Sequence, residues 1–192
     1  IVASDSPIDA YLQALTAEIR MVAAALPQRM KVRHIHWGGG SPTILEPADI
    51  DRVMAAMRAA FTLSANCEFA DEIDPRGLDE PRISALARNG LTRVSIGVQD
   101  FDTGVQKAIN RIQTVEETAR VIAAFRAHGV KSLNIDAIYG LPGQTRDKLF
   151  ATLDAVVKLS PDRIALFGYA HVPWMKTHQK MIDEITLPGL DD

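Results

Sequence analysis

The chain has 192 residues, a length that is sufficient for one domain with a full core. Of these residues 47% are hydrophobic and 23% are charged, as is usual for a globular protein. A formal net charge of −3 leaves no basic surface for nucleic acid or an anionic membrane, and no apolar run has the length of a bilayer span. We therefore expect neither nucleic acid nor a membrane as a partner, and we expect a monomer.

Cys67 is the only cysteine. A single thiol cannot form an internal disulfide, which is compatible with a reducing cytoplasm, and we expect that location. It also cannot hold an iron–sulfur cluster or a zinc ion by itself. The first residues, IVASDSPID, lack an initiating Met, and we expect them to belong to the interior of a longer protein.

Amphipathic runs alternate with short apolar runs along the chain. The amphipathic runs predict helices over residues 8–26, 47–61, 79–90, 114–129 and 145–160. The apolar runs predict strands over residues 32–37, 67–73, 93–98, 132–140 and 163–170. Thr114 and Glu117 have capping-box spacing, and Gly90 and Gly129 are typical of the C′ position that follows a helix. Right-handed crossovers make this order an α/β fold with a parallel sheet, although the pattern does not separate a doubly wound sheet from a barrel.

Polar residues and glycines recur after the predicted strands. The segments are 38–43, 72–75, 99–100, 110–111, 136–143 and 169–171. In parallel α/β folds, ligands bind at the carboxyl ends of the strands. The recurrence therefore predicts one ligand site at that edge of the sheet.

The stretch HIHWGGGSPT places three consecutive glycines, Gly38 to Gly40, at the end of a strand. Glycine adopts positive φ and lets a ligand approach the backbone closely. The run therefore indicates either a tight strand-to-loop turn or a polar ligand held by backbone groups. It lacks the G-x-G-x-x-G spacing and a following Lys-Ser/Thr, which argues against a dinucleotide fingerprint and a P-loop.

Three charged residues near strand ends are candidates for ligand contacts. Glu72 lies in an apolar strand, where a buried carboxylate needs ligand hydroxyls, an ammonium or an ion pair. Arg111 can clamp a carboxylate with two hydrogen bonds, or lie solvated at a helix end. Asp136 can accept from ligand hydroxyls or from a nearby turn. No Ser/His/Asp, Cys/His or H-x-x-x-H arrangement is present, and we assign no catalytic nucleophile or metal ligand.

Five stretches carry a resemblance to a known family: HIHWGGGSPTIL, EIDPRGL, RVSIGVQDFDTGVQKAINRIQ, NIDAIYGLPGQT and PDRIALFGYAHVPW. In this order and spacing they resemble the oxygen-independent coproporphyrinogen III oxidases (coproporphyrinogen dehydrogenases), a radical S-adenosylmethionine (SAM) group, over residues 8–188. The resemblance implies an incomplete six-stranded (β/α) barrel, of which the predicted strands match the second to the sixth. It also implies a partial barrel core, residues 1–170, and a tail, residues 171–192, that leads to a second domain not present in this chain.

The resemblance also implies a reaction and its site. In that family a reduced [4Fe–4S] cluster cleaves SAM to a 5′-deoxyadenosyl radical, which abstracts hydrogen from a propionate of coproporphyrinogen III. Loss of carbon dioxide and an electron leaves a vinyl group, and two rounds give protoporphyrinogen IX, so an electron donor is implied as a partner. The residues implied to line the SAM sites are Gly39, Gly40, Ser41, Glu72, Gln99, Arg111, Asp136 and Ala170. The family can hold two SAM molecules there, or one together with a substrate-like molecule. Ser41 stands where many members have Thr, which keeps the hydroxyl.

One part of the family pattern is missing. The Cys-x-x-x-Cys-x-x-Cys motif that holds the cluster does not occur in this sequence, nor does the strand that precedes it. We therefore assign the activity to a full-length protein, and we expect this chain alone to bind no cluster and to be inactive. Two alternatives stay open: a haem chaperone of the same superfamily, and a non-catalytic (β/α) ligand-binding domain. YAHVPW favours the oxidase over the chaperone, and three cysteines encoded just before Ile1 would exclude the non-catalytic domain.

Overall fold

The structure is a computed structural model that describes residues 7–189. The strands are β1 (Lys31–Trp37), β2 (Thr62–Ile73), β3 (Arg93–Gln99), β4 (Ser132–Tyr139) and β5 (Arg163–Gly168). The α-helices are α1 (Pro7–Ala25), α2 (Pro47–Ala60), α3 (Glu80–Arg88), α4 (Thr103–Ala108), α5 (Val115–Ala127) and α6 (Arg146–Lys158). Three short 3₁₀ helices are η1 (Pro42–Ile44), η2 (Thr177–Met181) and η3 (Glu184–Thr186).

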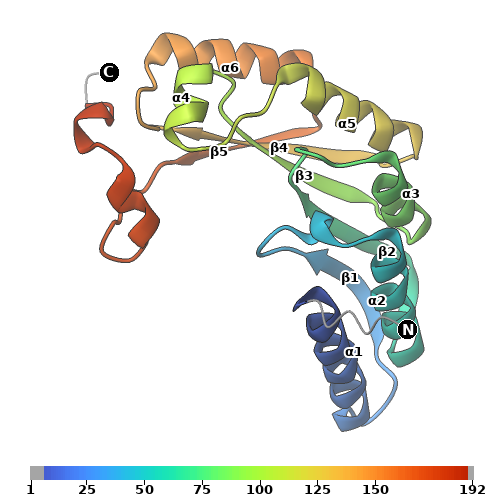
Figure 1. Ribbon diagram of the computed structural model, residues 1–192. Coiled ribbons are helices and arrows are strands. Elements are labelled where there is room, and N and C mark those ends of the chain that lie inside the picture. The colour runs from blue at the N-terminus through green and yellow to red at the C-terminus, as the bar shows by residue number, and fades with distance from the viewer. Residues whose placement is uncertain (1–6, 190–192) are drawn as a thin grey trace, which may run out of the picture.

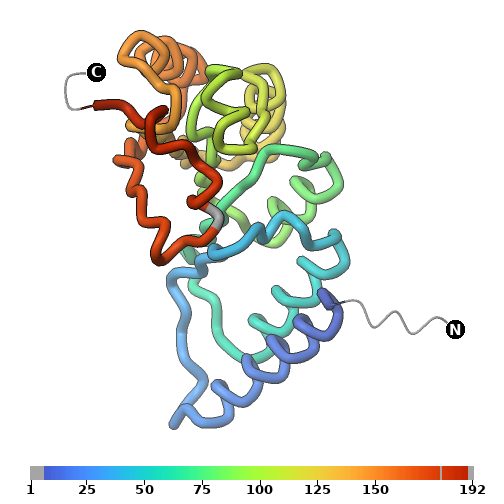
Figure 2. The backbone as a smooth tube through the Cα atoms, turned by 60° about the vertical axis from the view of Figure 1, so that its left-hand side comes forward, coloured from blue at the N-terminus to red at the C-terminus, as the bar shows by residue number. Residues whose placement is uncertain are grey.

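The five strands form one parallel sheet in chain order, from β1 at one edge to β5 at the other. The sheet curls into half a barrel, with α2, α3, α5 and α6 on its outer side and its inner side open (Figure 1). In the tube view the colours follow one another along the sheet, because each strand lies next to its predecessor in the chain (Figure 2). The predicted partial barrel is therefore confirmed, and a doubly wound sheet, whose strand order reverses at a switch point, is excluded.

The hydrophobic core lies between the sheet and the outer helices. The strand register places Ile73, Ile96 and Ile135 side by side on β2, β3 and β4, and all three are buried. The rings of Phe69 and Trp37 meet edge-on, with their centroids 5.1 Å apart. Successive side chains of a strand point to opposite faces, so the residues between these core positions face the inner side of the half-barrel.

The helix caps follow the sequence signals with one difference. Gly90 and Gly129 have φ values of +95° and +83° and follow the C-cap residues Asn89 and His128, which confirms them as the C′ residues of α3 and α5. The Thr114 hydroxyl accepts from the Glu117 N–H at 3.0 Å, but the Glu117 carboxylate accepts instead from the Gly77 N–H at 3.3 Å. Only half of the predicted capping box therefore forms, because the carboxylate holds a neighbouring loop.

Most predicted boundaries differ from the structure by one or two residues, the start of β2 differs by more, and one helix is not predicted. β2 begins at Thr62 instead of residue 67, and β5 ends at Gly168 instead of residue 170. The sequence analysis does not predict α4, which is too short to show a helical period. The Asp102 carboxylate caps α4 by accepting from the Val105 N–H at 2.9 Å. The helix carries the chain from the end of β3 to Arg111, one of the predicted site residues.

The chain turns back toward the barrel after β5. The Gly143 N–H, in the loop before α6, donates to the Thr186 carbonyl of η3 at 2.7 Å. Figure 1 shows this C-terminal segment at the end of the sheet opposite α1. Among residues 7–189, no helix has the combination of length and apolar character that a membrane span requires.

Candidate active site on the inner face

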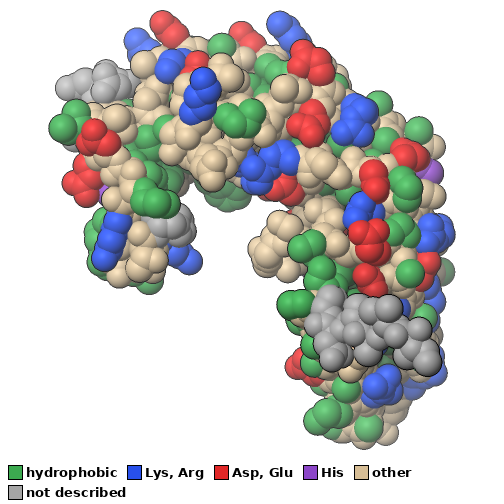
Figure 3. Space-filling model, viewed as in Figure 1, with side chains coloured by type: hydrophobic (Ala, Val, Ile, Leu, Met, Phe, Trp, Pro, Cys, Tyr) green, Lys and Arg blue, Asp and Glu red, His purple; other side chains and the backbone are tan. Residues whose placement is uncertain are grey.

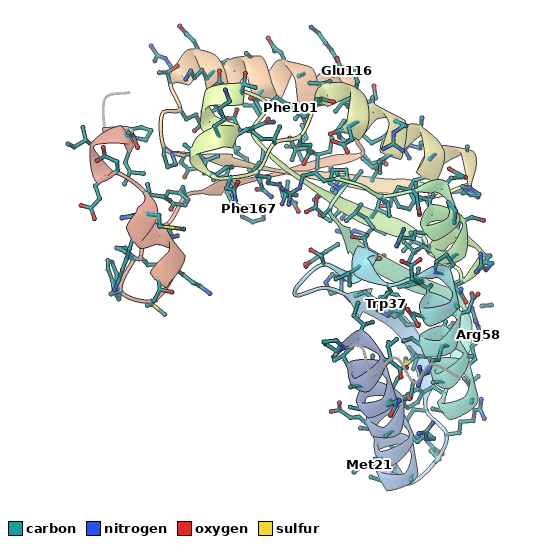
Figure 4. All side chains as sticks on the ribbon, in the orientation of Figure 1. Met21, Trp37, Arg58, Phe101, Glu116 and Phe167 are labelled. Atoms are coloured by element: carbon teal, nitrogen blue, oxygen red, sulfur yellow. The ribbon has the colours of Figure 1, made fainter. Side chains whose placement is uncertain are left out.

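The inner face of the half-barrel is polar. The side chains that alternate with the core on β2, β3 and β4 include Glu72, Ser95, Asn134 and Asp136. Figure 3 shows this side as an open hollow between the two ends of the sheet, and Figure 4 shows Phe167 projecting into it from β5. Polar groups therefore gather on a concave surface at the carboxyl ends of parallel strands, where this architecture holds its ligands.

The three glycines after β1 have different surroundings. A Cβ on Gly38 would lie 2.8 Å from both the Glu72 carboxylate and the His36 ring, so no side chain fits there. Gly39 has a φ of +104°, and a Cβ on it would meet nothing within 4 Å. A Cβ on Gly40 would also meet nothing within 4 Å, and its φ is not positive. Close packing therefore explains why residue 38 is a glycine, and the positive φ explains why residue 39 is one. Neither reason applies to Gly40, which leaves the close approach of a ligand as the explanation there.

The carboxylate of Glu72 lies beside this loop. Its Oε2 accepts from the Gly39 N–H at 3.2 Å, and its Oε1 lies 3.4 Å from the Nε2 of His36. The Glu72 side chain is 47% exposed, so the expectation of a buried carboxylate is wrong at this position. The buried carboxyl of the strand is its neighbour Asp71, which points to the opposite, helix-covered face. Glu72 keeps free lone pairs that can accept from a ligand ammonium or hydroxyl.

Gly40 and Ser41 border a cavity of about 800 Å³ between β1 and α1. His34 and His36 of β1 also line it, together with apolar side chains of α1. Ser41 precedes η1, but its hydroxyl makes no capping hydrogen bond to that turn. The hydroxyl that the sequence analysis assigned to a ligand is therefore not used by the adjacent backbone.

Gln99 and Arg111 meet over Gly97. Gln99 ends β3 with a φ of +69°, a conformation that costs free energy for a residue with a side chain, and the register slips between Gly97 and Gln99. The Nη2 of Arg111 donates to the Gly97 carbonyl at 2.9 Å, and its Nη1 donates to the Asp74 carboxylate at 3.3 Å. A Cβ on Gly97 would lie 3.0 Å from the Gln99 amide nitrogen and 3.2 Å from the Arg111 guanidinium. Glycine at this position therefore leaves room for both side chains.

Arg111 is not a solvated residue at a helix end. Its side chain is only 20% exposed, and burial lowers the pKa of its guanidinium, although the Asp74 carboxylate beside it opposes this shift. Its Nε is buried and has no hydrogen-bond partner among the described residues. A buried N–H without a partner at the edge of a polar hollow indicates an acceptor that is supplied by a ligand.

Asp74 lies between two arginines. Burial acts to raise the pKa of its carboxyl, but hydrogen bonds from Arg76 and the charge of Arg111 outweigh burial and hold that pKa below its ordinary value. Its Oδ1 accepts from the Arg76 N–H at 3.1 Å, which closes a turn after β2. Asp74 is therefore more buried and more fully paired with cations of the chain than Glu72 is.

Asp136 is held by two side chains that the sequence analysis did not identify. Its carboxylate accepts from the Ser95 hydroxyl at 2.9 Å and from the Asn134 amide at 2.7 Å. The Asn134 amide also donates to the Ser95 hydroxyl at 2.8 Å. Ser95 and Asn134 could have been predicted from the alternation of side chains along β3 and β4, which places both residues on the inner face together with Asp136. The carboxylate oxygens keep lone pairs for a ligand hydroxyl.

Ala170 lies apart from the other predicted site residues. It follows β5, at the opposite edge of the sheet from the Gly38–Ser41 loop. Its carbonyl accepts from the side-chain amide of Gln179 at 3.0 Å. The structure therefore brings Glu72 to the glycine loop and Gln99 to Arg111. Ala170 also lies at the carboxyl ends of the strands, but it follows β5, which is the outer strand farthest from β1.

The described residues do not fit an iron–sulfur cluster. In residues 7–189, no group of three or more His, Cys, Asp or Glu side chains could hold a metal ion. Cys67 is half-buried in β2, and burial raises the pKa of its thiol, which disfavours the thiolate that a metal requires. By contrast, Gly40 offers open backbone, Glu72 a half-exposed carboxylate and Arg111 an unpartnered N–H, and these groups fit polar ligands that carry an ammonium or a carboxylate.

The chain is similar to proteins of known name. An oxygen-independent coproporphyrinogen III oxidase from Cereibacter sphaeroides (strain ATCC 17025 / ATH 2.4.3) is 49% identical over 184 residues, which are 96% of this chain and 41% of that protein. An oxygen-independent coproporphyrinogen III oxidase from Helicobacter pylori (strain ATCC 700392 / 26695) is 42% identical over 183 residues, which are 95% of this chain and 40% of that protein. The chain therefore spans less than half the length of these relatives, and its motifs resemble the family that the sequence analysis named.

Solved structures and a family model agree with this similarity. The structure of coproporphyrinogen III oxidase (HemN) from Escherichia coli matches with a TM-score of 0.93 at 39% identity, covering 99% of this chain and 44% of that one. The radical SAM methyltransferase TsrM from Kitasatospora setae matches with a TM-score of 0.65 at 16% identity, covering 84% of this chain and 29% of that one, which shows a shared fold only. The family model described as the radical SAM superfamily matches residues 7–156, from the start of α1 into α6. By its half-barrel and by this match, the chain belongs to the radical SAM superfamily.

Proposed function

We propose that this chain is the SAM-binding half-barrel of an enzyme that converts two propionate side chains of coproporphyrinogen III to vinyl groups, with loss of carbon dioxide, to give protoporphyrinogen IX. The observation that supports this most is the buried Nε of Arg111, which lacks a partner at the carboxyl edge of the sheet that also holds Glu72. The identity of 49% to a named oxidase supports the choice of substrate. Coproporphyrinogen III and an electron donor would be the partners of the whole protein.

The residues of the inner face have separate roles toward SAM. Glu72 would accept from the ammonium group, and Arg111 would donate from Nε to a carboxylate, of SAM or of a propionate. Gln99 and Asp136 would bind the ribose hydroxyls, and Gly40 would let the cofactor lie against the backbone. SAM, when bound, supplies the 5′-deoxyadenosyl group that takes a hydrogen atom from the substrate.

No step that needs the cluster is assigned to residues of this chain. The one cysteine, Cys67, cannot supply the three thiolates of the family motif, so those ligands would come from other parts of the full-length protein. What this chain contributes is a positioned cofactor site, closed on one side by the sheet.

The proposed activity is tested with the full-length protein under anaerobic conditions. Incubation with SAM, a strong reductant and coproporphyrinogen III should give protoporphyrinogen IX and 5′-deoxyadenosine, measured by chromatography after oxidation of the porphyrinogens. Release of 5′-deoxyadenosine without any vinyl product would reject coproporphyrinogen III as the substrate and leave SAM binding standing.

The chain of 192 residues serves as the control in that experiment. After treatment with iron and sulfide it should bind no [4Fe–4S] cluster and release no 5′-deoxyadenosine, because it has a single cysteine. Stoichiometric iron together with a stable visible absorption shoulder would contradict this expectation.

Glu72→Ala should weaken SAM binding by the full-length protein more than Asp74→Ala does. Loss of a charged acceptor for an ammonium costs roughly 10- to 100-fold in affinity. Asp74 faces Arg76 and Arg111, so its removal should act mainly on the turn and on protein stability, and should reach SAM only indirectly, through the position of Arg111. The measurement is a calorimetric titration with SAM, accompanied by thermal unfolding of each variant.

The matched control is Glu68→Ala. Glu68 is an exposed carboxylate on the same strand, and its only ion pair is with Arg93, at 3.6 Å, within residues 7–189. This variant should bind SAM as the wild type does. Equal losses for the Glu72 and Asp74 variants would refute the assignment of Glu72 to the cofactor.

A further inference from the structure

Gln179 is a buried polar residue in a segment to which the site described above assigns no role. It lies in η2, after the end of the sheet, and is 8% exposed. Lys180 and Met181 beside it are exposed, Met181 by 84%. A buried side-chain amide requires hydrogen-bond partners, so the partners of Gln179 indicate what it does.

Both ends of the Gln179 amide bind the chain that follows β5. Its Oε1 accepts from the Val172 N–H at 2.6 Å, and its Nε2 donates to the Ala170 carbonyl at 3.0 Å. In a parallel sheet, a residue of one strand donates to a carbonyl and accepts from the N–H two positions later on its neighbour. The side chain of Gln179 thus reproduces the hydrogen-bond pattern of one residue of a neighbouring parallel strand.

The backbone after β5 depends on these two bonds. β5 is an edge strand that pairs with β4 as far as Gly168, and the Tyr169 N–H then donates to the Tyr139 carbonyl at 2.8 Å. Beyond that point, the Ala170 carbonyl and the Val172 N–H have Gln179 as their one hydrogen-bond partner within the described chain. Removal of the amide would leave both groups without a partner. The remaining bonds of this segment, from the Met175 and Lys176 N–H groups to the Val172 carbonyl and between His171 and Glu184, join it only to the chain that follows it.

We propose that Gln179 is a positioning residue that holds residues 170–172 as a continuation of β5 and thereby fixes the Ala170 backbone at the carboxyl edge of the half-barrel. The proposal rests on the proposed function and on the contact between Ala170 and SAM that the family resemblance implies. Gln179 itself does not touch the cofactor, and its effect on SAM passes through Ala170.

The decisive variant is Gln179→Met in the full-length protein. Methionine has nearly the same length and volume, so it keeps the packing of η2 and removes both hydrogen bonds. The matched control is Lys180→Met, which places the same side chain on the exposed neighbour. Each variant is compared with the wild type by amide hydrogen exchange of the peptide that contains residues 170–172, by SAM titration and by thermal unfolding.

We expect exchange at residues 170–172 to become about tenfold faster in Gln179→Met, and SAM affinity per folded molecule to fall about tenfold. Exchange in β3 should be unchanged, and Lys180→Met should match the wild type in both measurements. Unchanged exchange at residues 170–172 would overturn the proposal, as would faster exchange with unchanged SAM affinity. Absence of SAM binding by the wild type would overturn the proposed function, and the exchange measurement would still decide whether Gln179 holds this segment.

Discussion

Asp71→Val should raise the thermal unfolding temperature of the chain, and the difference from the wild type should grow between about pH 4 and about pH 8. Asp71 is 1% exposed and faces the core from β2, between Trp37 and Val94 of the neighbouring strands. Neither of its carboxyl oxygens has a hydrogen-bond partner in the described chain. Burial raises the pKa of Asp71 from 3.8 to about 8, and the negative charge of Glu72 adds to this shift.

The sign of the pH dependence follows from the direction of this shift. The folded chain keeps the Asp71 proton up to about pH 8, whereas the unfolded chain loses it near the ordinary value of 3.8. Between these values unfolding releases a proton, so the free energy of unfolding falls as the pH rises. The loss is on the order of 5 kcal/mol across this window, which corresponds to roughly 10 to 20 °C in the unfolding temperature.

Asp71→Asn separates ionisation from polarity. The amide has the same shape and stays uncharged, so this variant should lack the dependence of stability on pH and still be less stable than Asp71→Val. Glu68→Gln, at an exposed carboxylate of the same strand, should leave the pH profile as it is in the wild type. Parallel pH profiles for the wild type and Asp71→Asn would show that Asp71 is ionised in the folded chain.

Gly39→Val and Gly40→Val should affect the full-length protein in different ways. Valine at a φ of +104° is strained whatever the space around it, so Gly39→Val should lower the unfolding temperature of the ligand-free protein. The expected cost is about 1–3 kcal/mol, or roughly 3 to 10 °C. At Gly40 the backbone conformation tolerates a side chain and no atom lies within 4 Å of the Cβ position, so the ligand-free protein should keep its stability.

SAM binding distinguishes the two glycines. If Gly40 is a glycine because a ligand lies against it, Gly40→Val should abolish SAM binding in a calorimetric titration while the unfolding temperature stays constant. Gly39→Val should weaken binding by displacing the N–H that donates to Glu72. Normal SAM binding by Gly40→Val would reject the role of the glycine run in holding the cofactor.

The sequence predicts the order and type of the main elements because their hydrophobic periods are regular. It does not predict α4, since six residues are fewer than two helical turns. Side chains alternate along CEFADEI, so Asp71 shares a face with the apolar Phe69 and Ile73. This alternation already indicates Asp71, and not Glu72, as the buried carboxyl of the strand. Propensity alone favours exposure for both acids, and only packing of the helices decides which face is covered.

The site is predictable to the extent that it follows strand ends. Glu72, Gln99 and Asp136 lie at or near the carboxyl ends of their strands, where the fold class leads one to look. The sequence does not show that Gln99 adopts positive φ or that Arg111 bends back to the Gly97 carbonyl, because both depend on contacts between distant segments. It also gives no sign of Gln179, which lies in a short turn without periodicity and binds backbone atoms rather than a pattern of side chains.

The agreement between strand order and chain order bears on how the sheet assembles. Each strand pairs with the one synthesised before it, so no later strand has to insert between two that are already paired. A nascent chain leaving the ribosome can therefore extend the sheet one strand and one helix at a time, and loop closure stays local throughout. Every intermediate of this kind exposes a growing edge of unpaired backbone, and the next segment to emerge is the one that covers it.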